Sequence, residues 1–467
     1  MTRQRARPGA GPFATAQTFL ALVAVAGFAA VALAAPVEVF DGSTVHFSRL
    51  DNGLRVIVKE DHSAPVVAVN VVIRAGSRCE TRDNNGVSHF IEHMSFRAAR
   101  DGGGGRLGPT IEGLGGIANG GTLRDFTHYT TVTASQHLDV ALNALAKALV
   151  RPQFDDAAVL DERLVLMREA IHLTDQPAAA AWDMAFKLAY GDHPYALPIG
   201  GTSASLLRVD KDALTAFYGQ WYVPNNASVV IVGDVAPEKA AAAVARAFLG
   251  WQQGGEPAPP PAVPPLRKRL ERVKPGEAPQ ATVLMGFHAP GIARPDDVCA
   301  ADLLLTILGE GYTSRLTQAL RQTHLADQVR VDFLTQELPG LFGVLATCAP
   351  ERVDDVREAI EREVTRLSNE LIGDEELANA QRRLAHSFVF SNETFEEQAA
   401  TLGFYEVIAS YEFACGYLDR VRSVTAAELQ TAARAYLNPK RSVWVALVPQ
   451  TGPGTGPGVV AARGAAE

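Results

Sequence analysis

The stretch Trp221–Val235, WYVPNNASVVIVGDV, decides the fold because the chain contains it twice. It resembles Ala435–Pro449, AYLNPKRSVWVALVP, and 214 residues separate Tyr222 from Tyr436. Both stretches lead into a run of β-branched residues that favours a strand. A period this long is too great for a solenoid, so the pattern indicates one internal duplication.

A helix is predicted before each copy, with Asp210 and Thr425 as N-caps. Nearer the N-terminus, apolar and polar residues alternate over Leu54–Lys59, as in a strand. Val66–Ile73 is apolar enough for a buried strand. Helical patterns follow over residues 139–149 and 155–173. Hairpin strands beside helices predict an α+β fold, with two related α/β-sandwich domains that arise from the duplication.

A proline-rich segment separates the two copies. Residues 254–265, GGEPAPPPAVPP, favour an extended and semi-rigid connection. We therefore expect a first domain over residues 36–250, a linker over 251–268 and a second domain over 269–450. The tail over residues 451–467 is rich in glycine and small residues, and we expect it to be disordered.

The N-terminus has the order of a secretory signal peptide over residues 1–34. Arg3, Arg5 and Arg7 precede an apolar run and a small-residue cleavage site. This predicts a secreted or periplasmic protein; the alternative is a membrane anchor over residues 13–35, which are near spanning length. Loss of the three arginines changes the net charge from −9 to −12. Such an acidic chain argues against nucleic acid as a partner.

The run VSHFIEHMSF, Val87–Phe96, carries the clearest chemical signal. On a helix, His89, Glu92 and His93 project within one arc of the surface. Two neutral imidazoles one turn apart can bind one Zn²⁺, and a carboxylate beside the metal can accept a proton from the water it activates. The alternative to a metal site is a polar helix face that holds two histidines by chance. The scattered cysteines, without a CxxC pair, exclude a zinc ribbon.

A catalytic zinc needs a third protein ligand. The predicted helix VLDERLVLMREAIHL carries Glu162 and Glu169 two turns apart, on a stripe shared with apolar residues. Because a buried carboxylate is costly unless it is paired or bound to metal, one of these acids is a good third ligand. His172 is a competing candidate.

With these residues in hand, the chain resembles the insulinase/pitrilysin family of inverted-zincin peptidases, in its short two-domain form. The run RAGSRCETRDNNGVSHFIEHMSF is similar to the family signature. The resemblance assigns the metal ligands as His89, His93 and Glu169, which lies 76 residues after His93. It makes Glu92 the catalytic base and Glu162 the accompanying acid.

The resemblance also implies a function: a zinc-dependent endopeptidase with one Zn²⁺ per chain, acting on peptides or unfolded segments. The fold would be half of a clamshell, with the first domain binding the zinc. Extended peptides would add as a strand to a sheet edge, where Asn119 in GGIANGGTLRDFTHY contacts the substrate backbone. Short members pair two chains, so we expect a homodimer or a heterodimer with a related chain. The alternative function is a non-catalytic subunit that shapes the chamber.

One part of the second domain departs from the family pattern. Arg321 matches the family's substrate-binding arginine, but Gln328 stands where a tyrosine is usual. Either a partner chain supplies the tyrosine, or the correspondence is shifted by a residue or two.

Overall fold

The computed structural model describes residues 39–97, 107–150, 152 and 154–449. The predicted signal peptide, the alternative anchor over residues 13–35 and the predicted disordered tail lie outside these described residues. Within the described ranges, no helix combines the length and the apolar character that crossing a membrane requires.

Six strands form the first sheet, in the order β1-β2-β6-β3-β5-β4. Only β2 and β6 run parallel; the other neighbours are antiparallel. β3 and β6 are central and covered on both faces, which explains their continuous apolar sequences. The strands are β1 (Val45–Arg49), β2 (Arg55–Glu60), β3 (Val66–Ile73), β4 (Ile117–Thr122), β5 (Thr127–Ala134) and β6 (Ala227–Gly233).

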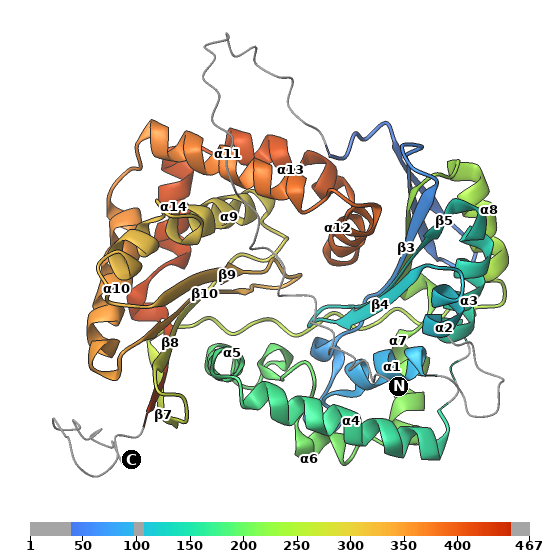
Figure 1. The fold of residues 1–467 in the computed structure, drawn as a ribbon, viewed down its shortest axis with the longest axis horizontal. Coiled ribbons are helices and arrows are strands. Elements are labelled where there is room, and N and C mark those ends of the chain that lie inside the picture. Colours follow the sequence, from blue (N-terminus) through green and yellow to red (C-terminus); the bar gives the residue numbers. More distant parts are fainter. Residues whose placement is uncertain (1–38, 98–106, 151, 153, 450–467) are drawn as a thin grey trace, which may run out of the picture. The chain divides into compact units, whose positions relative to one another are not determined.

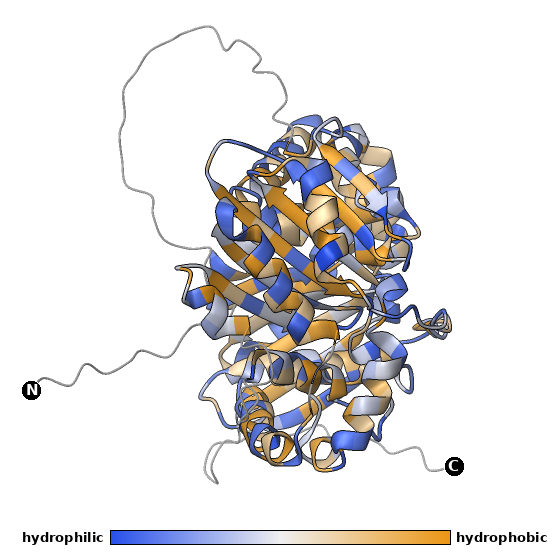
Figure 2. Cartoon of the chain, turned by 90° about the vertical axis from the view of Figure 1, so that its right-hand side faces the viewer, coloured by the Kyte–Doolittle hydropathy of each residue, from blue (hydrophilic) through white to orange (hydrophobic). Residues whose placement is uncertain are grey.

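The second sheet repeats this arrangement with five strands, in the order β7-β11-β8-β10-β9. β11 is parallel to β7 and antiparallel to β8, as β6 is to β2 and β3. The duplication and the α+β fold class are therefore confirmed. In Figure 2 the strands are coloured mainly as hydrophobic. The strands are β7 (Leu270–Gly276), β8 (Ala281–His288), β9 (Gln328–Phe333), β10 (Leu341–Cys348) and β11 (Val443–Pro449).

Helices cover the sheets, and both predicted N-caps are observed. Asp210 accepts a hydrogen bond from Ala213 N, and Thr425 forms a capping box with Glu428. In the first half the helices are α1 (Val87–Phe96), α2 (Leu107–Glu112), α3 (Leu138–Val150), α4 (Asp156–Thr174), α5 (Pro177–Tyr190), α6 (Ser203–Leu206), α7 (Lys211–Trp221) and α8 (Pro237–Ala247). In the second half they are α9 (Pro295–Gly309), α10 (Val353–Asn369), α11 (Asp374–Phe390), α12 (Phe395–Ile408), α13 (Glu412–Ser423) and α14 (Ala426–Tyr436).

Two helices are exchanged between the halves. α5 precedes the proline-rich segment in sequence but packs on β8 and β11 of the second sheet, while α12 packs on β3 and β6 of the first (Figure 1). Ala181 and Ala185 of α5 share a buried cluster with Leu284 and Val445. Residues 251–267, which connect the halves, contain neither helix nor strand. The limits of the two predicted domains stay a prediction, since each sheet is covered partly by the other half.

The exchanged helices lie close to the sheets because small residues meet them. A Cβ atom at Gly343 of β10 would overlap the indole ring of Trp182 on α5. A Cβ atom at Gly403 of α12 would lie 2.8 Å from Val72 Cγ2 and 2.9 Å from Asn70 Nδ2. Asn70 is buried and donates to the carbonyl of Ala399 on α12 at 3.2 Å. Contacts this close leave no room for an added methyl group.

We expect Gly343→Ala to lower the free energy of unfolding by about 1–3 kcal/mol, since the methyl group must displace Trp182 from the sheet. Chemical denaturation followed by tryptophan fluorescence measures the change. Gly219→Ala on α7 is the control, because nothing lies within 4 Å of its added Cβ atom. Equal stability of the Gly343→Ala variant and the wild type would contradict the close packing of α5.

Candidate metal centre

Helix α1 presents two different faces. Val87, Phe90 and Ile91 are fully buried in the core of the first half. His89 and His93 are only partly buried and face acids of α4. The helices α1 and α4 lie next to each other (Figure 1). The apolar face fixes the orientation of the helix, so the two imidazoles point away from the core.

The start of α1 is held by Glu80, which the sequence analysis did not single out. Its carboxylate accepts hydrogen bonds from Gly86 N at 2.7 Å, Ser88 N at 2.9 Å and Asn85 Nδ2 at 2.8 Å. An anion at this end also complements the helix dipole. Burial raises the pKa of Glu80, although the bonds from Gly86 and Ser88 oppose the shift. The available signal in the sequence was an acid a few residues before the turn residues Asp83–Gly86 and the start of the helix.

Glu162 connects α4 to α1. Its Oε1 accepts a hydrogen bond from His93 Nδ1 at 2.9 Å, and its Oε2 accepts one from Arg97 Nη1 at 2.6 Å. Arg97 also bonds Asp161 at 2.9 Å, so one guanidinium spans two acids of α4. Because Nδ1 of His93 is used in this bond, Nε2 on the other side of the ring is left to face Glu169. Glu162 is therefore a hydrogen-bond partner of the His93 imidazole.

The third acid, Glu169, lies opposite both imidazoles. Its Oε2 is 3.6 Å from His93 Nε2, and its Oε1 is 4.0 Å from His89 Nε2. One ligand atom from each of the three residues lies within 4.8 Å of the others. His172, the competing candidate, is exposed and is not part of this cluster.

The donor set fits a tetrahedral zinc ion. With metal–ligand bonds of about 2.0–2.2 Å, tetrahedral ligand atoms stand about 3.3 Å apart. The two nitrogen–oxygen distances exceed this value slightly, and the half-exposed carboxylate of Glu169 can close the difference by rotation. Two imidazoles and one carboxylate are a common catalytic zinc set.

The two histidines have opposite protonation tendencies. Burial, together with the charge of His93, lowers the pKa of His89 to about 3. Burial also lowers the pKa of His93, but the bond to Glu162 and the charges of Glu92 and Glu169 outweigh it and raise the pKa. His89 is thus neutral at physiological pH, which is the state that binds metal.

Glu92 stands beside the cluster without joining it. Its Oε2 is 3.8 Å from His89 Nε2 and accepts a hydrogen bond from Thr122 Oγ1 at 3.2 Å. The residue is 8% exposed, and burial raises its pKa against the opposing effects of His93 and Thr122. A carboxylate with a raised pKa is suited to taking up and returning a proton. Thr122, at the end of β4, was not foreseen because the contact depends on the sheet.

Asn119 lies on β4, the edge strand that ends at Thr122. It is exposed, and its Oδ1 accepts a hydrogen bond from Gly120 N at 2.9 Å. Ring atoms of Phe96 occupy the space that a Cβ atom at Gly120 would need, at 2.5 Å. The strand therefore passes next to the last residue of α1.

Arg321 and Gln328 are placed in the second half. Arg321 ends a π-helical turn over Thr317–Arg321, and Gln328 begins β9, the edge strand of the second sheet. Both residues are exposed, and neither belongs to the cluster of His89, His93 and Glu169. The structure thus brings five of the predicted site residues together and leaves this pair apart.

A duplicated α+β chain with paired histidines and an adjacent acid on one helix, facing an acid on a second helix, defines a class of metallopeptidase folds. Residues 55–203 match the model of Insulinase (Peptidase family M16), and residues 208–384 match that of Peptidase M16 inactive domain. Together these matches span most of the chain. The protein belongs to the insulinase family of peptidases, as the resemblance indicated.

Relatives and solved structures agree with this assignment. The zinc protease PqqE of Helicobacter pylori is 27% identical over 86% of this chain and 92% of its own length. An uncharacterized zinc protease of Streptomyces coelicolor is 28% identical over 86% of this chain and 89% of its own length. The crystal structure of a protease from Helicobacter pylori has a TM-score of 0.81 at 24% identity and covers 87% of this chain and 99% of that one. At this identity the structure supports the fold alone.

In the metal-free protein we expect His93 to titrate above its ordinary value of 6.5 and His89 to stay neutral down to about pH 3. Because the pKa of His93 is raised by folding, its contribution to stability is present at low pH and disappears as the pH rises through the folded-state value. Histidine NMR titration measures both values.

Glu162→Gln should lower the pKa of His93, since the bonded negative charge is lost. Glu358→Gln, an exposed change on α10, serves as the control and should leave the pKa of His93 where it was. The same titration curve for His93 in both variants would refute the contact between α1 and α4.

Proposed function

We propose that this protein is a zinc-dependent endopeptidase that hydrolyses peptides or unfolded protein segments. The observation that carries the proposal is the convergence of His89, His93 and Glu169 within 4.8 Å, with Glu92 at their side. Relatives with the name zinc protease add support. One Zn²⁺ per chain matches the three ligand atoms.

The roles of the residues follow from their positions. When bound, zinc polarises the scissile carbonyl and makes water a stronger acid. His89, His93 and Glu169 would hold the ion, and Glu162 would keep the His93 ring in the tautomer that exposes Nε2. Glu92 would accept the proton of the attacking water and deliver it to the leaving amine. Thr122 orients the Glu92 carboxylate through its hydrogen bond.

The edge strand β4 is the proposed place for the substrate. Among the strands that the structure describes it pairs with β5 alone, so its outer side offers backbone groups for an added strand. Asn119 and Thr122 both lie on this strand, and Thr122 contacts Glu92, so a peptide bound here would pass the metal ligands. Backbone pairing suits many sequences, which agrees with a preference for unfolded segments.

We also propose that the active form is a pair of chains, either a homodimer or a heterodimer with a related chain. The segment Arg321–Phe333 contains no tyrosine, so a shift in the correspondence does not restore the residue that Gln328 replaces. In addition, α4 exposes an unusual number of large apolar side chains. These are Leu160, Leu164, Val165, Ile171 and Leu173, each at least 40% exposed.

The export of the protein is proposed from residues 1–34 alone. Their order of arginines, apolar run and small residues matches a secretory signal, and a secreted or periplasmic location suits a peptidase of unfolded segments. Retention by residues 13–35 as an anchor is the alternative.

A second candidate function is a non-catalytic subunit that shapes the chamber for a partner. The match of residues 208–384 to an inactive domain, together with Gln328, favours it. The retained cluster of metal ligands favours the peptidase.

Glu92→Gln should reduce peptide cleavage by on the order of a hundredfold or more while zinc stays bound, since an amide cannot accept the proton. Cleavage of a mixed peptide library, together with metal analysis, measures both quantities. Glu358→Gln is the matched control on the exposed face of α10.

Full cleavage by Glu92→Gln would discard the assignment of the base. A wild-type preparation that holds zinc but cleaves nothing, alone or as a dimer of defined mass, would instead support the non-catalytic function.

Glu169→Ala should release zinc, because only two imidazoles would remain as ligands, and His172→Ala should retain it. Zinc per chain after dialysis, measured by elemental analysis, distinguishes the two variants. The opposite pattern would transfer the third-ligand role to His172.

A further inference from the structure

A second polar site lies beneath the proline-rich segment, outside the metal centre. A pocket of about 540 Å³ is lined by four arginines, Arg49, Arg55, Arg74 and Arg78, and by the carbonyl-rich run Glu256–Pro261. The arginines come from the end of β1, the start of β2 and the segment that follows β3. None of these residues contributes to the cluster around His89.

Two of the guanidinium groups keep buried donors without partners. Arg78 is 7% exposed, and its Nη1 makes no hydrogen bond. Nε of Arg74 is likewise buried and unpaired. The exposed side chain of Arg49 makes no hydrogen bond or ion pair with any other described residue, although its backbone pairs with Arg55 of β2. Buried donors are normally satisfied, so unpaired ones beside a pocket indicate a missing acceptor.

The acids around the pocket are already engaged. Glu337 Oε2 forms an ion pair with Arg78 Nη2 at 2.7 Å, and Glu406 Oε1 forms one with Arg55 Nε at 3.0 Å. Asp125, 3.4 Å from Arg78 Nε, accepts hydrogen bonds from Tyr195 Oη and Glu337 N. The remaining acid of the lining, Glu256, is exposed on the proline-rich segment.

Three of the four arginines, Arg49, Arg55 and Arg74, also act on one another electrostatically. Burial lowers the pKa of Arg55; Glu406 opposes this shift, and the positive charges of Arg74 and Arg49 add to it. At Arg78 burial lowers the pKa, but the charges of Asp125, Cys79 and Glu337 outweigh it and raise the pKa. The repulsion is therefore among Arg49, Arg55 and Arg74. An anion that enters the pocket would relieve this repulsion.

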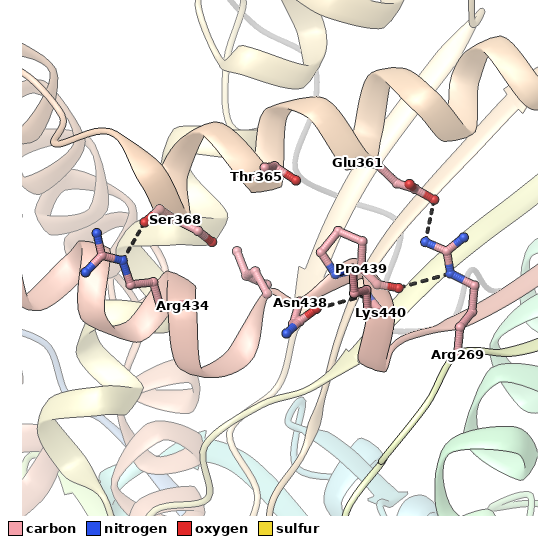
Figure 3. A pocket seen from close by; sticks show the side chains of 9 residues that line it. Arg269, Glu361, Thr365, Ser368, Arg434, Asn438, Pro439 and Lys440 are labelled. Atoms are coloured by element: carbon pink, nitrogen blue, oxygen red, sulfur yellow. Dashed lines mark hydrogen bonds and ion pairs between the residues drawn. The ribbon is translucent and has the colours of Figure 1, made fainter.

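The pocket in Figure 3 provides a contrast. It is larger, at about 740 Å³, and is also lined by cations, including Arg269, Arg434 and Lys440. Here Arg269 is paired with Glu361 at 2.6 Å, and Arg434 Nε donates to the carbonyl of Ser368 at 2.7 Å. Both arginines of that pocket thus serve contacts within the protein, whereas the pocket beneath the prolines leaves arginine donors free.

The proline-rich segment forms a fixed wall of the site. Asn225 and Gly254 exchange two hydrogen bonds, of 3.0 and 3.2 Å, at one end of this wall. At the other end, His193 Nε2 lies 3.0 Å from the carbonyl oxygen of Pro261. Prolines have no N–H group, so the arginines remain the main donors. The rings of the prolines and of Trp221 supply apolar surface.

We propose that this pocket binds a small organic anion that carries a carboxylate or phosphate group. The two oxyanions share the paired oxygen geometry that guanidinium recognises. The volume exceeds that of a bare oxyanion and falls in the range of small-molecule sites, and the apolar wall fits an organic portion.

The position of the pocket gives the ligand a structural effect. Arg55 and Arg74 reach Glu406 of α12, and Arg78 reaches Glu337 after β9, so residues of the first half bind acceptors of the second. A bound anion would stabilise these contacts between the halves. This inference goes beyond the peptidase function and does not depend on it.

The test is calorimetric titration of the purified chain with inorganic phosphate and, separately, with succinate, at constant ionic strength. We expect saturable binding of at least one anion in the millimolar range or tighter, with a rise in the thermal unfolding midpoint. The double variant Arg49→Gln, Arg74→Gln should bind at least tenfold more weakly. Arg272→Gln, which removes an exposed charge on β7, should bind like the wild type.

Each outcome bears on the proposal. Binding of phosphate alone or of succinate alone identifies the group recognised, and either result supports the site. No saturable binding, or an equal loss in Arg272→Gln, overturns it. If the double variant does not fold, the single change of exposed Arg49 carries the same expectation. Glu92→Gln should keep full anion binding, so failure of the peptidase proposal and failure of this one are distinguishable.

Discussion

A carboxylate buried between two helices must be paired, and Glu162 satisfies this requirement with His93 and Arg97 of the α1 region. This contact sets the register of α4 over α1. Because Glu169 lies two helical turns beyond Glu162, the same register brings it opposite the Nε2 atoms of both histidines. Metal–ligand bonds near 2 Å require the ligand atoms to be placed accurately. The candidate site therefore depends on Glu162, although this acid is not one of the three proposed ligands.

The duplication produced two copies with different tasks. In the first, α1 is amphipathic and presents its polar residues to α4. In the second, the helix at the equivalent place, α9, buries Val298, Leu303 and Leu304 and carries no histidine. It serves as core. The exchange of α5 and α12 makes each sheet rely on the other copy, which explains why the described residues pack as one unit.

The seam between the copies is also where the unpaired arginines gather. Ion pairs such as Arg55–Glu406 and Arg78–Glu337 cross it, yet donors of Arg74 and Arg78 remain free. Buried cations without partners oppose folding. A contact between the halves that contains such cations, beneath the proline-rich segment, is therefore poorly explained as a structural contact alone. The metal centre and this seam are thus two polar sites built from different parts of one scaffold.

The features that depend on near neighbours in the chain could be predicted from the sequence. The helical spacing of His89, Glu92 and His93, the caps at Asp210 and Thr425 and the repeat of one strand motif all follow from backbone geometry over a few residues. From the residues alone, the third ligand stayed open among Glu162, Glu169 and His172, and the resemblance to a family selected Glu169.

Which acid faces the imidazoles became visible in the folded chain, because it depends on how α4 docks against α1. The cap from Glu80, the bond from Thr122 to Glu92, the exchanged helices and the arginine pocket depend equally on surfaces that meet across long stretches of chain. Local periodicity carries no information about such docking. Burial and charge pairing between remote segments settle it.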